Sequence, residues 1–170
     1  MSRERNWNKR YITGDLPWDT GKHDFNLSEI ITKRHIRPCK VLEFGCGTGS
    51  NAIWLSRQGF SATAVDITEI AIQRAIKKAS EAGVKCKFYV RDFMKQKIAG
   101  APFSFVFDRG CFHSFDLARE RSKYAKIAQG LGLLNAETHE NWKIGQFLVS
   151  MIASPVMLLL FSYIFIATRQ

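Results

Sequence analysis

The chain has 170 residues, of which 46% are hydrophobic and 24% charged, and its formal net charge is +10. This length is typical of one domain with a substantial core. Acidic, polar and aromatic residues interrupt the basic ones throughout, so the sequence lacks the continuous basic arm that would indicate a nucleic-acid partner. The positive charge remains compatible with an anionic substrate or an anionic membrane surface.

The four cysteines, Cys39, Cys46, Cys86 and Cys111, show neither a CxxC spacing nor a repeated framework. Thiols that stay reduced are the simplest explanation. Residues 1–10 are polar and lack the apolar core of a signal peptide. We therefore expect a cytoplasmic location.

The first 28 residues predict an N-terminal arm outside the core. They are polar with interspersed aromatic residues, and the segment 14–21 contains two glycines and a proline, which favours an ordered loop. Trp18 lies in the middle of this loop, where it can either fold back on the core or cover a ligand. After the arm, the apolar spacing predicts a helix over 27–36 with Ser28 as its N-cap.

Strands and helices then alternate. Apolar runs predict strands, and helical periodicity with Gly59 and Gly83 as stops predicts helices. The expected strands cover 41–44, 61–66, 85–90 and 103–107, and the expected helices cover 52–58 (capped by Ser50 or Asn51), 69–80 (capped by Thr68, with Ile72, Ala75, Ile76 and Ala79 on one face) and 119–128. This order predicts an α/β fold with a doubly wound, mostly parallel, Rossmann-like sheet covered on both faces.

The pattern changes after residue 128. The segment 145–152 fits a fifth strand, which follows an enlarged connection. Residues 144–167 carry no charge and are long enough to span a bilayer, although Pro155 in their middle argues against one membrane helix. We expect a shortened or divergent C-terminal sheet edge, and a membrane contact through this stretch stays open. An exposed edge would favour association, so both a monomer and a dimer are expected alternatives.

These boundaries divide the chain into an arm over 1–28, a core domain over 29–152 and an apolar tail over 153–170 of uncertain role. Four acidic residues lie in or just after the expected strand ends of the core domain: Glu43, Asp66, Asp92 and Asp108. The carboxyl ends of parallel strands meet at one edge of the sheet, where such sheets bind ligands. We therefore expect the four acids to share one pocket.

The segment 43–49, which reads Glu-Phe-Gly-Cys-Gly-Thr-Gly, joins the first expected strand to the next helix. Glycines at alternate positions let the backbone turn sharply and approach a bound molecule. Asp66, at the end of the second strand, is placed to bind ribose hydroxyls. The dinucleotide pattern G-x-G-x-x-G fails because Ser50 stands at its last position, and no P-loop Gly-Lys-Ser/Thr follows.

The spacing Glu43-x-Gly45-x-Gly47-x-Gly49 resembles motif I of the class I S-adenosylmethionine-dependent methyltransferases. Their cofactor carries an ammonium and a sulfonium but no phosphate, so a carboxylate in the loop suits it. The pairs Asp66-Ile67 and Asp92-Phe93 match the family's ribose and adenine positions. The resemblance implies that the cofactor contacts Trp18, Glu43, Gly45, Cys46, Gly47, Gly49, Asp66, Ile67, Asp92, Phe93 and Asp108.

Within this family the chain looks most similar to the thiopurine, thiol and halide methyltransferase-like group. That likeness rests on the arm over 11–25 and on Phe-Asp-Arg-Gly-Cys-Phe-His over 107–113. It implies that the arm covers the active site and that Asp108, Arg109 and His113 are the catalytic candidates. Asp108 or His113 would act as a base or position the substrate, and Arg109 would favour an anionic one. His113 is equally compatible with an ordinary loop histidine.

Cys111 and His113 supply only two potential metal ligands, so no metal is expected. The resemblance implies in-line transfer of a methyl group to a small-molecule acceptor, a thiol or similarly soft nucleophile, with S-adenosylhomocysteine as the second product. Two alternatives stay open. The chain could methylate protein or nucleic acid, or it could be a truncated or membrane-tethered inactive relative.

Overall fold

The computed structural model describes residues 3–115, 118–131 and 167–168. In chain order, its elements are α1 (Arg3–Thr13), α2 (Phe25–Lys33), β1 (Lys40–Phe44), α3 (Ser50–Arg57), β2 (Ser61–Asp66), α4 (Glu69–Glu81), β3 (Lys87–Val90), β4 (Phe105–Asp108), the 3-10 helix η1 (Phe112–Ser114), α5 (Ala118–Leu131) and β5 (Ala167–Thr168).

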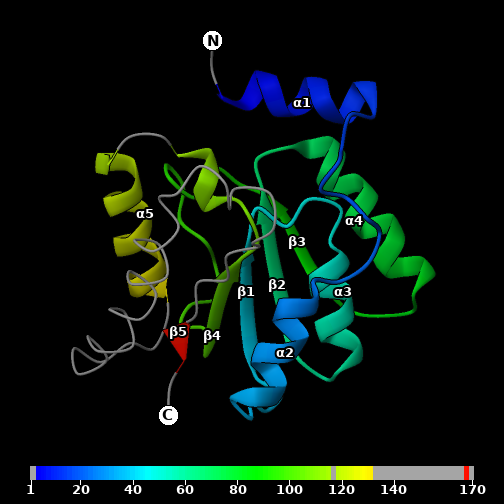
Figure 1. Cartoon of the computed structure of the whole chain (residues 1–170), viewed down its shortest axis with the longest axis vertical. Coiled ribbons are helices and arrows are strands. Elements are labelled where there is room, and N and C mark those ends of the chain that lie inside the picture. Colours follow the sequence, from blue (N-terminus) through cyan, green and yellow to red (C-terminus); the bar gives the residue numbers. More distant parts are fainter. Residues whose placement is uncertain (1–2, 116–117, 132–166, 169–170) are drawn as a thin grey trace, which may run out of the picture.

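The sheet has the order β3-β2-β1-β4-β5 (Figure 1). The pairs β1–β2, β1–β4 and β2–β3 are parallel, and β5 runs antiparallel to β4. The chain moves outward from β1 to β3 and then crosses to β4 on the other side of β1. This reversal creates a crevice at the carboxyl ends of β1 and β4, the place where open α/β sheets bind ligands. The predicted α/β fold with a mostly parallel sheet is confirmed.

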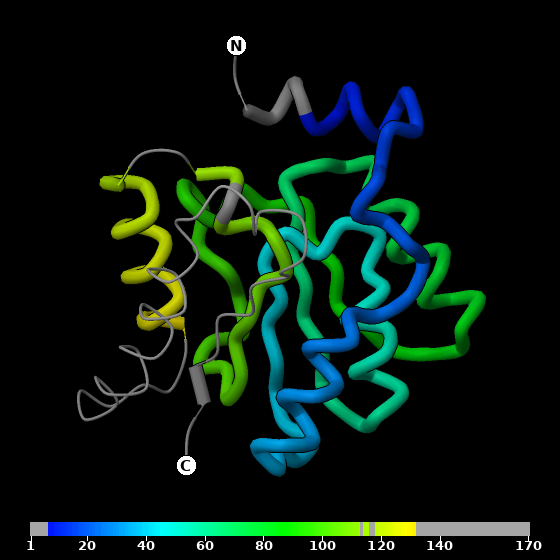
Figure 2. The backbone as a smooth tube through the Cα atoms, in the orientation of Figure 1, coloured from blue at the N-terminus to red at the C-terminus, as the bar shows by residue number. Residues whose placement is uncertain are grey.

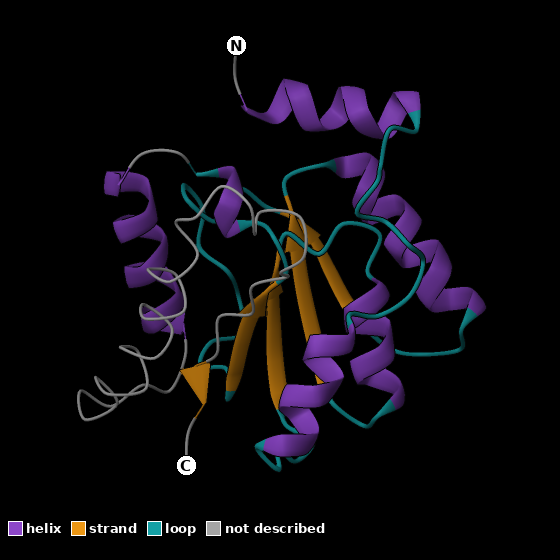
Figure 3. Ribbon diagram, viewed as in Figure 1, coloured by secondary structure: helices purple, strands orange, loops and turns teal. Residues whose placement is uncertain are grey.

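Helices cover both faces of the sheet (Figure 3). Successive residues of a strand point to opposite faces. On one face, Phe44 packs against Tyr124 of α5 with their ring centroids 5.4 Å apart. On the other face, Val41 belongs to a buried cluster with Leu55 of α3 and Ile72 of α4. A strand buried on both faces is rich in apolar residues, and Val41, Leu42 and Phe44 made β1 predictable although Glu43 interrupts them.

Two predicted helix starts are wrong by a few residues. Helix α2 begins at Phe25, because the Asp24 carboxylate accepts a hydrogen bond from the backbone amide of Asn26 and caps the helix there. The expected cap, Ser28, lies inside the helix. Helix α3 begins at Ser50, directly after Gly49, whose φ of +78° is left-handed.

Helix α4 has the predicted cap position, Thr68, although its side chain makes no capping hydrogen bond. Ile72, Ala75 and Ala79 are buried as expected. Ile76 is 51% exposed, so its predicted place on the buried face is wrong. Ala71 is buried in its place, so the buried face of α4 is rotated toward Ala71 relative to the predicted face.

The arm contains a helix, α1, that the sequence analysis did not predict. It lies across the carboxyl ends of the strands before the chain descends through a loop to α2 (Figure 2). The segment 14–21 forms the predicted loop. Tyr11 of α1 is buried, and its backbone carbonyl accepts a 3.0 Å hydrogen bond from Arg74 of α4. Contacts with α4 thus hold α1 in place, and a local pattern cannot reveal them.

Strand β5 lies at the C-terminal edge of the described part of the sheet. Strand β5 has two residues, and it pairs Thr168 with Phe105 and Ala167 with Val106. The fifth strand expected over 145–152 and the apolar stretch over 144–166 lie outside the described residues. None of the helices within the described ranges is long and apolar enough to cross a membrane.

Candidate functional site

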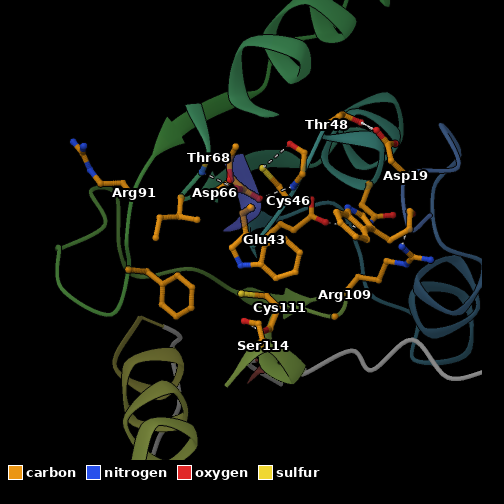
Figure 4. Close-up of a pocket in the computed structure, with 18 of the residues that line it drawn as sticks. Asp19, Glu43, Cys46, Thr48, Asp66, Thr68, Arg91, Arg109, Cys111 and Ser114 are labelled. Carbon is orange, nitrogen blue, oxygen red and sulfur yellow. Dashed lines mark hydrogen bonds between the residues drawn. The ribbon is translucent and has the colours of Figure 1, made fainter. Parts of the chain in front are cut away.

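A pocket of about 720 Å³ opens at the carboxyl ends of β1 and β2, beneath α1 and the arm (Figure 4). Its wall combines the glycine loop after β1, the turn after β2, the segment after β3, the segment after β4 and the arm. It brings together most of the residues implied by the resemblance, namely Trp18, Glu43, Gly45, Cys46, Gly47, Asp66, Ile67, Asp92, Phe93 and Arg109.

Gly45 and Gly49 of the loop are each required to be glycine for a different physical reason. Gly45, Gly47 and Gly49 all have positive φ, at 61°, 54° and 78°. A Cβ on Gly45 would lie 2.5 Å from the Cβ of Cys111, and a Cβ on Gly49 would lie 2.8 Å from a ring carbon of Phe88. Gly45 therefore permits close approach of the segment after β4, and Gly49 permits packing of α3 beside β3. Gly49 does not line the pocket.

Asp66 connects the glycine loop to the end of β2. Its Oδ2 atom accepts a 2.9 Å hydrogen bond from the amide of Gly47, and its Oδ1 atom accepts one of 2.8 Å from the amide of Thr68. Burial raises the pKa of this carboxyl, and the backbone donors oppose that rise. Both oxygens keep acceptor capacity, so hydroxyl groups of a ligand can still donate to them.

Glu43 lies at the inner end of the pocket and is only 2% exposed. Its Oε1 atom accepts a 2.8 Å hydrogen bond from the side-chain amide of Asn51. Its Oε2 atom is buried and has no hydrogen-bond partner among the described residues. Burial raises the pKa of Glu43 to about 8. Burial therefore favours the protonated form of Glu43, and a cationic ligand group would offset the cost of ionising it.

Asp92 and Phe93 line the pocket on the β3 side. Asp92 stabilises its own turn, because Oδ1 accepts from the amide of Met94 and Oδ2 pairs with Lys95 at 3.0 Å. Phe93 is buried against Phe44, with ring centroids 4.4 Å apart. Together they present an apolar surface beside a carboxylate, which suits a flat heterocycle that carries hydrogen-bond donors.

Asp108 is not among the residues that line the pocket, and its expected contact with the cofactor or acceptor stays a prediction. It is fully buried beneath the pocket, where Oδ2 accepts hydrogen bonds from the Phe112 amide and the Tyr124 hydroxyl. Burial raises the pKa of Asp108 to about 7. Because it anchors the turn after β4, Asp108 positions the residues that follow it, including Cys111 on the pocket wall.

Arg109 lines the pocket, but its guanidinium group is bound to the protein. Its Nε atom donates to Oδ2 of Asp24 at 2.7 Å, and one terminal nitrogen donates to the carbonyl of Trp18 at 3.0 Å. These two contacts hold the guanidinium against the arm, and the expectation that Arg109 favours an anionic substrate stays a prediction. His113 lies on η1, and its side chain is outside the described part of the chain.

Trp18 takes part in an aromatic cluster of the arm. Its ring lies edge-on to Trp7, with centroids 5.4 Å apart, and the Arg10 guanidinium lies 4.0 Å from its centroid. Both Trp7 and Trp18 line the pocket. The Trp18 ring thus packs within the arm and lines the cavity, and its role in covering a ligand stays a prediction.

Sequence reasoning missed two polar groups of the site. Asn51 was considered only as a helix cap, yet it is buried and binds Glu43. Thr48 donates to Asp19 of the arm at 2.9 Å and accepts a 2.8 Å hydrogen bond from Lys78. An amide side chain two residues after the last glycine of the loop is the signal that could have identified Asn51. The contacts of Thr48 join distant segments, and no local signal indicates them. Among the described residues, no group of three or more His, Cys, Asp or Glu could hold a metal.

Comparison with known proteins gives an independent result. Residues 41–131 match the sequence family described as a methyltransferase domain. A protein of Schizosaccharomyces pombe described as an uncharacterized methyltransferase is 39% identical over 74 residues, which cover 44% of this chain and 51% of the relative. "Probable thiol methyltransferase 2" of Arabidopsis thaliana is 27% identical over 112 residues, which cover 65% of this chain and 49% of the relative. The chain spans about half the length of these curated relatives.

The fold also resembles solved structures. The magnesium protoporphyrin IX methyltransferase of Synechocystis PCC 6803, crystallised with bound S-adenosylmethionine, superposes with a TM-score of 0.63. The two proteins are 18% identical, and the match covers 78% of this chain and 73% of that one. At this identity the likeness establishes a shared fold.

Proposed function

We propose that this chain, which belongs to the methyltransferase domain family, binds S-adenosylmethionine and transfers its methyl group to a small molecule bearing a thiol or a similarly soft nucleophile. One observation carries the proposal most directly. Glu43 presents a buried carboxylate oxygen without a described partner at the inner end of a pocket built on a glycine loop. The pocket therefore favours a ligand that combines a cationic group with an adenosine.

The residues present fit this cofactor. The Asp66 carboxylate can accept from ribose hydroxyls, and Ile67, Asp92 and Phe93 offer an apolar surface with an acceptor for adenine. Glu43 faces the end that would receive the ammonium group. A pyrophosphate in place of the ammonium group would meet the acidic side chain of Glu43, so a dinucleotide fits poorly.

When bound, the cofactor supplies a methyl group on a sulfonium, which is an activated leaving group. The protein then mainly aligns the acceptor and excludes water. Trp18 and Phe115 contribute aromatic surface to the pocket wall, and Cys111 and Ser114 lie opposite Glu43 and Asp66 in the close-up (Figure 4). The thiol of Cys111 and the aromatic ring of Phe115 offer a polarisable surface, which suits an acceptor sulfur.

The arm supports a small acceptor over a macromolecular one. Trp7, Tyr11 and Trp18 all line the pocket, so α1 and the arm loop cover part of its entrance. A soft thiolate needs only modest deprotonation, so a strong catalytic base is not required. The Arabidopsis relative, named for thiol methylation, is consistent with this acceptor class.

Turnover with matched acceptors tests the proposal. The purified chain would be incubated with S-adenosylmethionine and a panel of thiols, alcohols and amines of similar size, and S-adenosylhomocysteine would be measured. We expect release with thiols and its loss in Asp66→Ala. Release with alcohols or amines but not thiols would overturn the acceptor class, and no acceptor-dependent release would overturn the proposed activity.

A further inference from the structure

We propose that Asn51, Asp24 and Arg109 form a positioning relay that holds the arm loop, residues 14–24, over the pocket and couples it to Glu43. The coupling to a ligand rests on the proposed function, whereas the ordering of the arm loop does not. In this relay the guanidinium group of Arg109 binds the arm loop and not the substrate.

The first step joins the bottom of the pocket to the arm. Asn51 donates from Nδ2 to Oε1 of Glu43 at 2.8 Å, and its Oδ1 atom accepts from the backbone amide of Asp24 at 2.8 Å. A backbone amide can only donate, so the oxygen of Asn51 must face Asp24 and its NH2 group must face Glu43. Asn51 is buried, and its two contacts are therefore costly to lose.

The second step passes through Asp24, where the arm loop meets α2. Its Oδ1 atom caps the helix through the amide of Asn26, and its Oδ2 atom accepts from Nε of Arg109 at 2.7 Å. The Asp24 side chain is 6% exposed and that of Arg109 is 31% exposed. This pair lies largely out of solvent, so it is stronger than an ordinary surface ion pair.

The third step returns to the loop itself. Arg109 also donates to the carbonyl of Trp18 at 3.0 Å, so one guanidinium group binds both the middle and the end of the arm loop. Thr48 holds Asp19 between those two points. An unbroken series of hydrogen bonds therefore runs from the Glu43 carboxylate to the backbone of Trp18.

The relay has a consequence for ligand binding. A ligand group that pairs with Oε2 of Glu43 fixes the carboxylate, and Asn51 and Asp24 pass that restraint to Arg109 and Trp18. Binding at the inner end of the pocket then stabilises the cover at its entrance. Such coupling requires a physical network between two sites, and each link of this one is a measurable contact.

Hydrogen exchange of the full chain without ligand tests the ordering of the arm loop. The variants are Asn51→Ala, Arg109→Gln and their combination, with exposed Gln73→Ala and Arg57→Gln as matched controls. We expect the amides of residues 16–24 to exchange roughly five- to tenfold faster in each single variant than in the wild type. The double variant should exchange no faster than the single variants. Unchanged exchange, or effects that multiply in the double variant, would overturn the relay.

Asp24→Asn provides a milder variant, because asparagine also caps helices well and the backbone amide stays in place. It weakens the link to Arg109 and keeps both the cap of α2 and the amide that binds Asn51. Faster exchange confined to the arm loop is expected, and wild-type exchange in this variant would contradict the relay even if Asn51→Ala does not fold.

A second series adds S-adenosylhomocysteine. In the wild type we expect the ligand to slow exchange both at residues 45–49 and in the arm loop. In Asn51→Ala we expect the ligand to slow exchange at residues 45–49 but not in the arm loop. Equal slowing of the arm loop in both proteins would refute the coupling. A wild type that does not respond to the ligand would instead refute the proposed function, and the ligand-free series would still decide the relay.

Discussion

The backbone amide of Gly47 donates a 2.9 Å hydrogen bond to Oδ2 of Asp66, which joins the glycine loop after β1 to the end of β2. Thr68 donates to the other carboxylate oxygen, so Asp66 is held from both sides. The acid and the loop therefore form one rigid surface, and a change in either should alter ligand binding through the other.

Asp66→Ala should lower the affinity for S-adenosylmethionine by roughly ten- to a hundredfold, because hydrogen bonds to a charged group are stronger than neutral ones. Calorimetric titration measures the change. Glu81→Ala, which removes an exposed carboxylate from α4, is the control and should bind like the wild type. Equal affinities of Asp66→Ala and the wild type would contradict the ribose role of Asp66.

Gly45→Ala should destabilise the protein more than Gly83→Ala. The two glycines have similar φ, 61° and 65°, but only the Cβ at Gly45 meets another atom, the Cβ of Cys111 at 2.5 Å. The additional loss in the free energy of unfolding should be about 1–3 kcal/mol, as for overpacked cores. Urea denaturation of both variants gives this difference.

A second substitution separates the clash from backbone strain. Cys111→Gly in the Gly45→Ala background removes the colliding Cβ and should recover part of the lost stability. If Gly45→Ala and Gly83→Ala lose equal stability, or if Cys111→Gly makes the first variant worse, close packing is not the reason for Gly45.

The sequence was most informative where structure is local or strictly periodic. Strand β2, Ser61–Asp66, has the predicted bounds, because Gly59 before the β-prone run and the acid at its end mark the two ends of the strand. Glu43 and Asp66 were located as site residues, because motif spacing fixes their places at the ends of neighbouring parallel strands.

Contacts between distant segments could not be predicted from the sequence. Arg109 was interpreted as a substrate cation because nothing near it indicates Asp24, 85 residues earlier. Asp108 was placed on the pocket wall, but its neighbour in space, Tyr124, draws it beneath the pocket. Helix α1 depends on α4 in the same way. Local patterns report periodicity and turn chemistry, and tertiary partners decide where a polar side chain points.

Stability should depend on pH through Glu43. Its pKa is about 8 in the folded protein and 4.5 ordinarily, so the folded state retains a proton that the unfolded chain loses. The free energy of unfolding should be highest below pH 4.5 and fall as the pH rises toward about 8. Asp108 acts in the same direction, so Glu43→Gln is required for comparison.

Urea denaturation over this pH range should show a shallower decline for Glu43→Gln than for the wild type. Glutamine keeps an oxygen for Asn51 but cannot titrate. Parallel curves for the two proteins would show that Glu43 does not hold the extra proton.

Cofactor binding near neutral pH should release protons from Glu43. The folded protein holds this carboxyl largely protonated below pH 8, and a cationic ligand group favours the ionised form. Calorimetry in buffers with different ionisation enthalpies measures the number released. The wild type should release a larger fraction of a proton than Glu43→Gln, and equal release would place the cationic group elsewhere.

Direct calorimetric titration of the full chain with S-adenosylmethionine and S-adenosylhomocysteine, with NAD as the control, tests the central claim. The structure predicts one binding site for each of the first two ligands and no binding of NAD, because Glu43 favours the ammonium group that both S-adenosyl compounds carry over a pyrophosphate. Saturable binding of NAD, or no heat of binding with either S-adenosyl compound, would contradict the proposed cofactor site.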